Sequence, residues 1–167
     1  MGLLDSHPDK YLPRVDGALE CINHHDAQSH SGNAWTSTFK ETTSAIATLS
    51  CLIGSPATGT YSMEAFVETD AAATWTFSEA PNASGGSAIT GICDNRTSDT
   101  TDPLTITSEP TYVSSGTVIE NHLTSTIVGG ASRMHSHITM AVSSFYLVRV
   151  VTTSGMTAII NLHYNGE

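Results

Sequence analysis

The run from Met156 to Tyr164 alternates between apolar and polar side chains, and this pattern constrains the fold more than any other feature. Ala158, Ile160, Leu162 and Tyr164 share one parity, and the residues between them are mostly polar. Successive side chains of a β-strand point to opposite faces, so such a strand buries one face of a sheet. A second β-rich run, 144–152, precedes it across a Thr/Ser/Gly turn. The two runs predict a terminal hairpin that closes an all-β domain.

Short runs of the same kind fill most of the remaining chain. Turn residues separate them, with clear loops at 54–59 and 81–86, and no helical period exceeds two turns. This spacing favours a sandwich or a barrel. Strands are expected at 19–25, 34–40, 44–53, 61–69, 74–79, 88–93, 104–108, 117–119, 123–128 and 136–141.

Parity within these runs indicates which side chains are buried. In 61–69 the apolar Met63, Ala65 and Val67 oppose a face with Glu64 and Glu68. Large aromatic side chains mostly pack inside domains. The following are therefore expected in the core or on a sheet face: Trp35, Phe39, Trp75, Phe77, Phe145, Tyr146 and Tyr164.

A chain of 167 residues suits a single domain. Folding at this length buries roughly 70% of the surface of the unfolded chain, so a core forms without disulfides or metals. Residues 1–18 contain Pro8, Pro13 and Gly17 and have no apolar period. We predict an extended N-terminal arm at 1–18 and a single β-domain at 19–167.

Charge and composition exclude several partners. The formal net charge is −10, and the six basic residues are scattered, so we expect no direct nucleic-acid binding. No apolar run approaches the roughly 20 residues of a membrane span, and the start lacks the pattern of a secretory signal. The three cysteines, Cys21, Cys51 and Cys93, are far apart in the sequence. They are expected as small buried hydrophobic residues in a protein made in a reducing cytosol.

Histidines provide the only metal hypothesis. His24 and His25 are adjacent, and His135 and His137 lie two apart, so on a strand the latter pair would share a face. Gly129 followed by this pair matches the opening of a cupin metal motif. The cupin glutamate is missing, and the second motif does not follow. These four histidines are therefore candidates only, and no metal or cofactor is predicted.

Motifs for nucleophilic or phosphate chemistry are also missing from the sequence. No Gly-x-Ser-x-Gly segment occurs, and no glycine-rich stretch has a phosphate-binding pattern. Glu64 and Glu68 share a strand face, as the carboxylate pair of a glycosidase must. Solvated strand faces produce the same pattern more often. No catalytic residue is predicted, and the chain is interpreted as a non-enzyme.

The order of features from Ile89 onward resembles a family of tailed-bacteriophage proteins, the head decoration or capsid-stabilising (cement) proteins. Two departures from the family pattern occur, at 143–146 and at 163–167. The resemblance rests on these segments: Asp94-Asn95-Arg96-Thr97-Ser98, Leu104-Thr105-Ile106-Thr107, Ser115-Gly116-Thr117-Val118-Ile119, Phe145-Tyr146-Leu147-Val148-Arg149-Val150, Thr152-Thr153-Ser154-Gly155 and Ile160-Asn161-Leu162-His163-Tyr164.

The resemblance implies a β-sandwich or barrel of jelly-roll type, without catalysis. It also implies a homotrimer that binds the major capsid protein on the outer surface of a virion, after synthesis in the host bacterial cytoplasm. A hydroxyl-rich, weakly charged surface suits wide contacts of this kind. Two alternatives stay open. One is a carbohydrate- or receptor-binding β module of a fibre or tail, with Trp35 or Trp75 exposed to stack on sugar. The other is a cupin-type enzyme.

Overall fold

The fold is all-β. The structure is a computed structural model, and it describes residues 11–13, 19–21, 31–45, 47–97, 99–124, 132–152 and 154–166. For 11–13, 19–21, 43, 124 and 132–136 only the backbone is described. Every element in these ranges is a β-strand. No helix in them is long and apolar enough to cross a membrane.

The strands fall into a long-stranded framework and a set of short strands. The long strands are β3 (Ala34–Thr43), β4 (Thr48–Gly54), β5 (Tyr61–Thr69), β6 (Ala73–Glu79), β12 (Thr117–Thr124), β13 (Ser132–Met140), β14 (Phe145–Thr152) and β15 (Met156–Gly166). The short strands are β1 (Tyr11–Pro13), β2 (Leu19–Cys21), β7 (Asn82–Ser84), β8 (Ser87–Ile89), β9 (Ile92–Cys93), β10 (Thr105–Ser108) and β11 (Thr111–Ser114).

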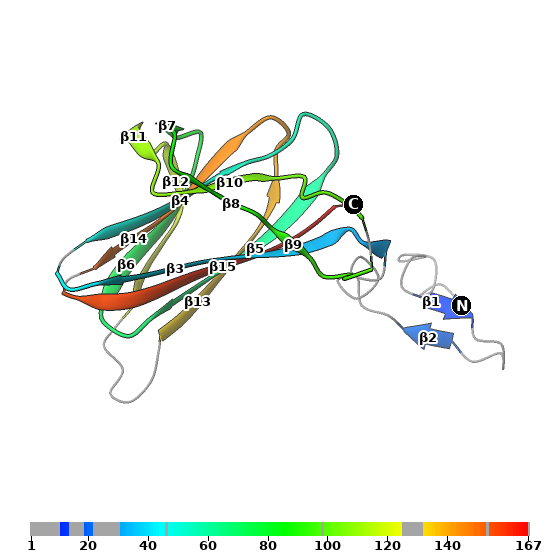
Figure 1. Cartoon of the computed structure of the whole chain (residues 1–167), viewed down its shortest axis with the longest axis horizontal. Coiled ribbons are helices and arrows are strands. Elements are labelled where there is room, and N and C mark those ends of the chain that lie inside the picture. Colours follow the sequence, from blue (N-terminus) through cyan, green and yellow to red (C-terminus); the bar gives the residue numbers. More distant parts are fainter. Residues whose placement is uncertain are drawn as a thin grey trace.

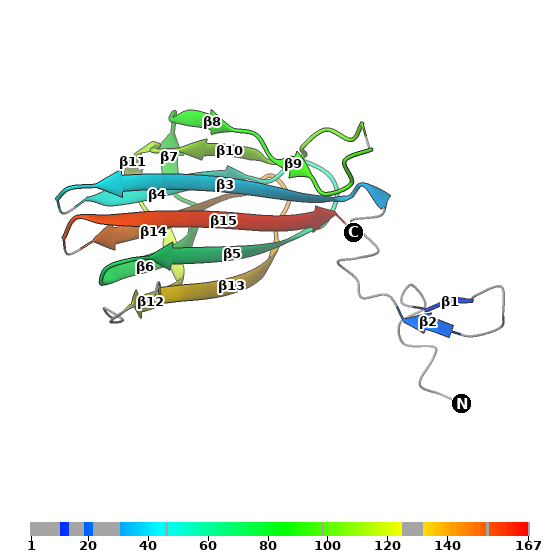
Figure 2. The ribbon, with the colours of Figure 1, turned by 60° about the horizontal axis from the view of Figure 1, so that its bottom comes forward.

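Two antiparallel sheets form the body of the protein (Figure 1). The six-stranded sheet has the order β12-β6-β14-β4-β10-β8, and the five-stranded sheet has the order β13-β5-β15-β3-β9. Figure 2 shows the two sheets as layers, with β3, β15, β5 and β13 in one of them. The expected all-β sandwich is confirmed.

The prediction that the last two strands form a terminal hairpin is wrong. β14 pairs with β4 and β6, whereas β15 pairs with β3 and β5, so 153–155 connects one sheet to the other. Alternation reveals that each strand has an apolar face, but it carries no information on the pairing partner. Consecutive long strands belong alternately to the two sheets. The exception is β6 and β12, which are neighbours in the six-stranded sheet.

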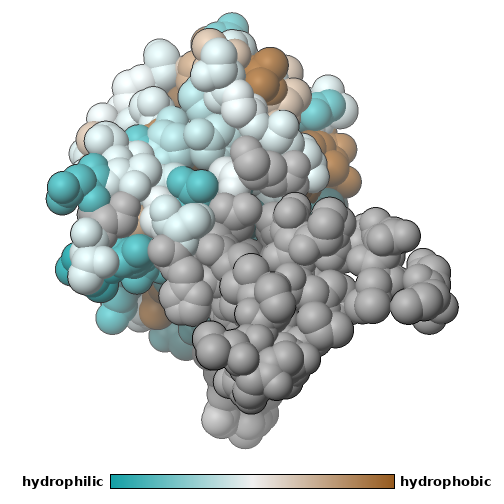
Figure 3. Space-filling view, turned by 90° about the vertical axis from the view of Figure 1, so that its right-hand side faces the viewer, coloured by the Kyte–Doolittle hydropathy of each residue, from teal (hydrophilic) through white to brown (hydrophobic). Residues whose placement is uncertain are grey.

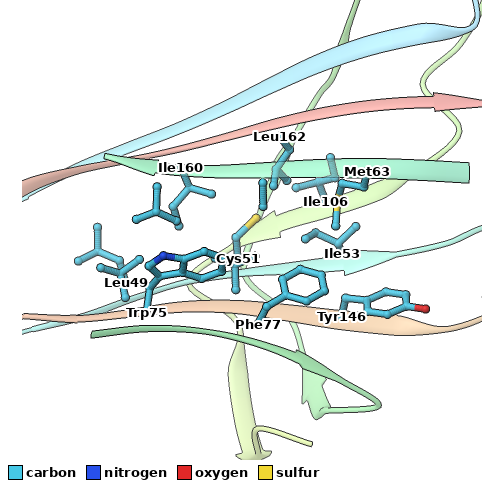
Figure 4. Close-up of a cluster of buried hydrophobic side chains, with 14 of the residues drawn as sticks. Leu49, Cys51, Ile53, Met63, Trp75, Phe77, Ile106, Tyr146, Ile160 and Leu162 are labelled. Carbon is cyan, nitrogen blue, oxygen red and sulfur yellow. The ribbon is translucent and has the colours of Figure 1, made fainter. Parts of the chain in front are cut away.

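The core lies between the facing sides of the two sheets. Met63, Ala65 and Val67 of β5 are buried, as their parity predicts, and so are Ala158, Ile160, Leu162 and Tyr164 of β15. Figure 4 shows side chains from both sheets meeting around Trp75 and Cys51. Phe77 and Tyr146 stack with ring centroids 5.8 Å apart. Of the expected aromatic residues, Phe145 lies on the outer face of its sheet and is 49% exposed.

Several predicted boundaries differ from the structure. The run 44–53 begins as a strand only at Thr48, and 88–93 divides into β8 and β9, which belong to different sheets. The runs 117–119 and 123–128 belong in part to the single strand β12, and 125–128 lie outside the described residues. The predicted loop 81–86 contains β7, whose partner β11 was not predicted. Such short strands depend on distant partners rather than on local alternation.

Little of the predicted N-terminal arm is described. β1 pairs with β2 in antiparallel orientation, with Tyr11 opposite Cys21, and the rest of 1–18 lies outside the described residues. Cys51 and Cys93 are free thiols, the first buried and the second half-buried. The side chain of Cys21 is not described.

Candidate binding surfaces

The predicted histidine pair lies on β13, an edge strand of the five-stranded sheet. His137 stands opposite Glu64 of β5, and His135 stands opposite Phe66. His137 is exposed, whereas the side chain of His135 and all of His24 and His25 lie outside the described residues. In the part of the chain that the structure describes, no three His, Cys, Asp or Glu side chains are grouped so that they could hold a metal ion.

A third histidine, His163 of β15, completes a row that the sequence analysis missed. The register places Glu64 between His137 on one neighbouring strand and His163 on the other. The His163 ring also meets the Phe66 ring edge-on, with centroids 5.3 Å apart. These residues lie far apart in the sequence, so only strand pairing reveals the row. It forms part of the polar outer face of the five-stranded sheet.

A shallow hollow of about 270 Å³ lies at one end of this face. Ile159 and Glu68 line it, together with Asp70 and Thr157. The Asp70 carboxylate already accepts a hydrogen bond from the Thr157 backbone N–H, at 2.7 Å. Glu64 and Glu68, considered above as a carboxylate pair, project from this same face of β5.

The β12 edge, defined here as Val118, Ile119 and Leu123, is the most apolar exposed surface among the framework strands. Their exposed fractions are 50%, 42% and 78%. β12 pairs with β6 on one side and ends the six-stranded sheet on the other. Val113 of β11 is also highly exposed. An edge strand of this composition is a template for association with another chain.

Two side chains of β12 close the core beside this edge. His122 stacks on the buried Trp75 with ring centroids 4.8 Å apart, and its Nε2 lies 2.9 Å from Glu120 Oε2. Trp75 is therefore covered by a partly exposed imidazole rather than open to solvent. His122 and Glu120 of β12 are thus partly buried beside the core, whereas Asn121 and the three apolar residues of the β12 edge are exposed.

The outer face of the six-stranded sheet is partly covered by the small β7/β11 sheet. A hollow of about 210 Å³ lies there, lined by Leu52, Thr107 and Phe145 from the large sheet and by Ala83 from β7. Next to it, the Arg149 guanidinium carbon lies 5.1 Å from the centroid of the Tyr112 ring of β11. Neither the hollow nor this pair is predictable from local alternation, because their residues come from strands far apart in the sequence.

Most of the described surface in Figure 3 is near neutral or hydrophilic, with separate apolar patches. No protein-family model matches the chain, and no curated protein is similar enough to suggest a relative.

Proposed function

We propose that this chain is a structural virion protein that binds the outer surface of a phage capsid and stabilises it, without an active site. The β12 edge is the observation that carries this proposal. It presents three exposed apolar side chains on a strand that, among the described residues, pairs on one side only and ends the six-stranded sheet. Burying such side chains against a neighbouring protein is favourable by about 25 cal/mol per Å².

The strand order supports the jelly-roll type that the family resemblance implies. β3, β5, β13 and β15 share one sheet and β4, β6, β12 and β14 share the other, with neighbours related as in a double Greek key. The segments that carry the resemblance include β14 and the end of β15, both of which supply the core. Another of these segments, 115–119, includes Val118 and Ile119 of the β12 edge, to which the capsid contact is assigned.

Co-sedimentation with undecorated mature heads of the corresponding phage tests the proposal. The wild-type chain is expected to pellet with the heads. Leu123→Asp places a charge on the β12 edge, so it should abolish pelleting. Val142→Asp is the matched control, because Val142 is 52% exposed in the turn between β13 and β14. A wild-type chain that stays in the supernatant would overturn the capsid role.

A homotrimer is a separate part of the proposal. Many equivalent contacts around a symmetric shell add up by avidity, and a trimer places three contact edges on one particle. Light scattering of the purified chain at high concentration measures the mass. A mass of 17.6 kDa, that of one chain, would remove the trimer and leave the capsid contact to be tested by itself.

The two tryptophans on which the carbohydrate-binding alternative depends are buried. This alternative required Trp35 or Trp75 to be exposed, but their exposed fractions are 3% and 0%. The indoles pack in the core, where Trp35 stacks with Tyr164 and Trp75 with His122. A sugar-binding role would need another platform, and a glycan array remains its direct test.

A further inference from the structure

We propose that Arg149 and the neighbouring hollow form a binding site for a small organic carboxylate with an apolar body. The site lies on the outer face of the six-stranded sheet, beside the β7/β11 sheet. It is independent of the capsid-binding role, which was assigned to the β12 edge.

Arg149 stands on this face between two neutral residues of the adjacent strands. In β14 the residues 146, 148 and 150 point into the core, so 145, 147 and 149 point outward. The residues directly opposite Arg149 are Ser50 of β4 and Thr76 of β6. The Tyr112 ring covers the guanidinium from the other side. The cation is thus half-buried between hydroxyl-bearing strands and an aromatic ring.

Among the described residues no carboxylate forms an ion pair with the Arg149 side chain. Its side chain makes no hydrogen bond within the described chain, and Nε is the guanidinium nitrogen that is buried without an acceptor. The Glu109 carboxylate, which approaches the same row, accepts a hydrogen bond from the Ser50 N–H at 2.9 Å. A buried N–H without an acceptor is costly, since this donor loses water and gains nothing in exchange. An external anion would remove that cost.

Further unpartnered polar groups lie on the same face. The Oγ of Ser78 and the Oγ1 of Thr107 are buried without a hydrogen-bond partner. They occupy one row across the sheet, in the order Thr107, Leu52, Leu147 and Ser78, next to the row of Arg149. Of the five such atoms among the described residues, three lie on this face, and the other two are the indole nitrogens of Trp35 and Trp75 in the core. Buried polar atoms in native proteins are nearly always paired, so Thr107, which lines the hollow, supports a place for a polar ligand or water there.

The hollow supplies the apolar half of the site. Leu52 and Phe145 line it, and the Phe145 ring packs so closely on Gly54 that a Cβ there would overlap it. Ala83, which lines it from β7, stands opposite Tyr112, so one small sheet borders both the hollow and the guanidinium. Its volume of about 210 Å³ is sufficient for a six-membered ring, since a cavity of about 150 Å³ binds benzene.

The chemistry of these two halves selects the ligand class. A guanidinium presents a planar fork of donors that matches a carboxylate in a bidentate manner. The adjacent hollow favours a compact apolar group attached to that carboxylate. Neither a simple inorganic anion nor a neutral apolar molecule would use both halves.

Phenylacetate is the probe, and amide NMR shifts of the full-length protein are the readout. We expect saturable shifts in β14, β4 and β11. Phenylacetamide, which has the same shape without the charge, should bind at least tenfold more weakly. Inorganic phosphate should also bind more weakly, because it leaves the hollow empty. Absence of saturable shifts with phenylacetate, or equal affinity for phenylacetamide, would overturn the site. Equal affinity for phosphate would overturn its apolar half.

Variants assign the site to named residues. Arg149→Gln should weaken phenylacetate binding tenfold or more, whereas Arg96→Gln, which changes an exposed arginine after β9, should leave it unchanged. Phe145→Ala keeps the guanidinium and should weaken phenylacetate but not phosphate. Because Phe145 is half exposed, this variant also tests the site if Arg149→Gln does not fold. Wild-type affinity in both folded variants would refute the proposal.

Discussion

His122 lies flat against Trp75, with ring planes at 25° and centroids 4.8 Å apart. The imidazole comes from an edge strand, and the indole is fully buried. This contact fastens the last strand of the six-stranded sheet to the core.

Replacing His122 with Ala should lower the free energy of unfolding by about 1 kcal/mol, because stacked aromatic pairs contribute about 0.5–1.5 kcal/mol beyond buried area. Urea denaturation followed by tryptophan fluorescence measures the change. Asn121→Ala on the same strand is the control, since Asn121 is exposed. Equal stability of the two variants would show that the stack does not hold the edge.

Gly91 lies against the Tyr164 hydroxyl so closely that a Cβ would overlap it. Gly91→Ala should therefore destabilise the protein by about 1–3 kcal/mol, as overpacking does. Tyr164→Phe removes the hydroxyl and its 3.1 Å hydrogen bond with Ser37. By itself this second change should cost about 1 kcal/mol.

A double-mutant cycle separates steric overlap from the lost hydrogen bond. With Gly91→Ala present, Tyr164→Phe should cost less than in the wild type, because it relieves the overlap. Thermal or urea unfolding of the four proteins provides the data. Strictly additive effects would contradict the close approach.

Leu162 is buried in β15, where its neighbours in the sequence point outward. Leu162→Ala should destabilise the protein by about 2–5 kcal/mol through lost burial and the cavity left behind. Ile159→Ala on the outer face of the same strand should cost clearly less. If the outer substitution were the more harmful one, the assignment of the two faces of β15 would be reversed.

Burial raises the pKa of the Cys51 thiol to about 12 from 9.0, with a further contribution from the Glu109 carboxylate. The folded protein thus holds this proton more tightly than the unfolded chain. The resulting stabilisation is complete below about pH 9 and is lost as the pH rises from there toward 12.

This linkage can be checked by measuring the free energy of unfolding between pH 8 and pH 10.5. One titrating group changes this free energy by roughly 1.4 kcal/mol per pH unit at most. The wild type should lose stability more steeply than Cys51→Ala above pH 9. Tyr164, whose pKa burial also raises, is present in both proteins and cancels in the difference. Parallel curves would contradict a protonated, buried thiol.

Of the surfaces described here, the sequence anticipated only a part of one. The spacing of His135 and His137 placed them two apart on a strand, and the register confirms that both belong to β13. The sequence did not indicate that His163 of β15 lies in the same row as His137 and Glu64. Nor did it link Arg149 to Tyr112, because β11 is too short to stand out by alternation and depends on β7 for pairing.

The sequence by itself determined the all-β class and the inward faces of the main strands. Met63, Ala65 and Val67, like Ala158, Ile160 and Leu162, are buried because a period of two residues is a local property of an extended chain. Only the tertiary structure decided that β14 and β15 belong to opposite sheets. Pairing depends on which distant strands bury their apolar faces against one another, and each strand carries the same pattern whichever partner it takes.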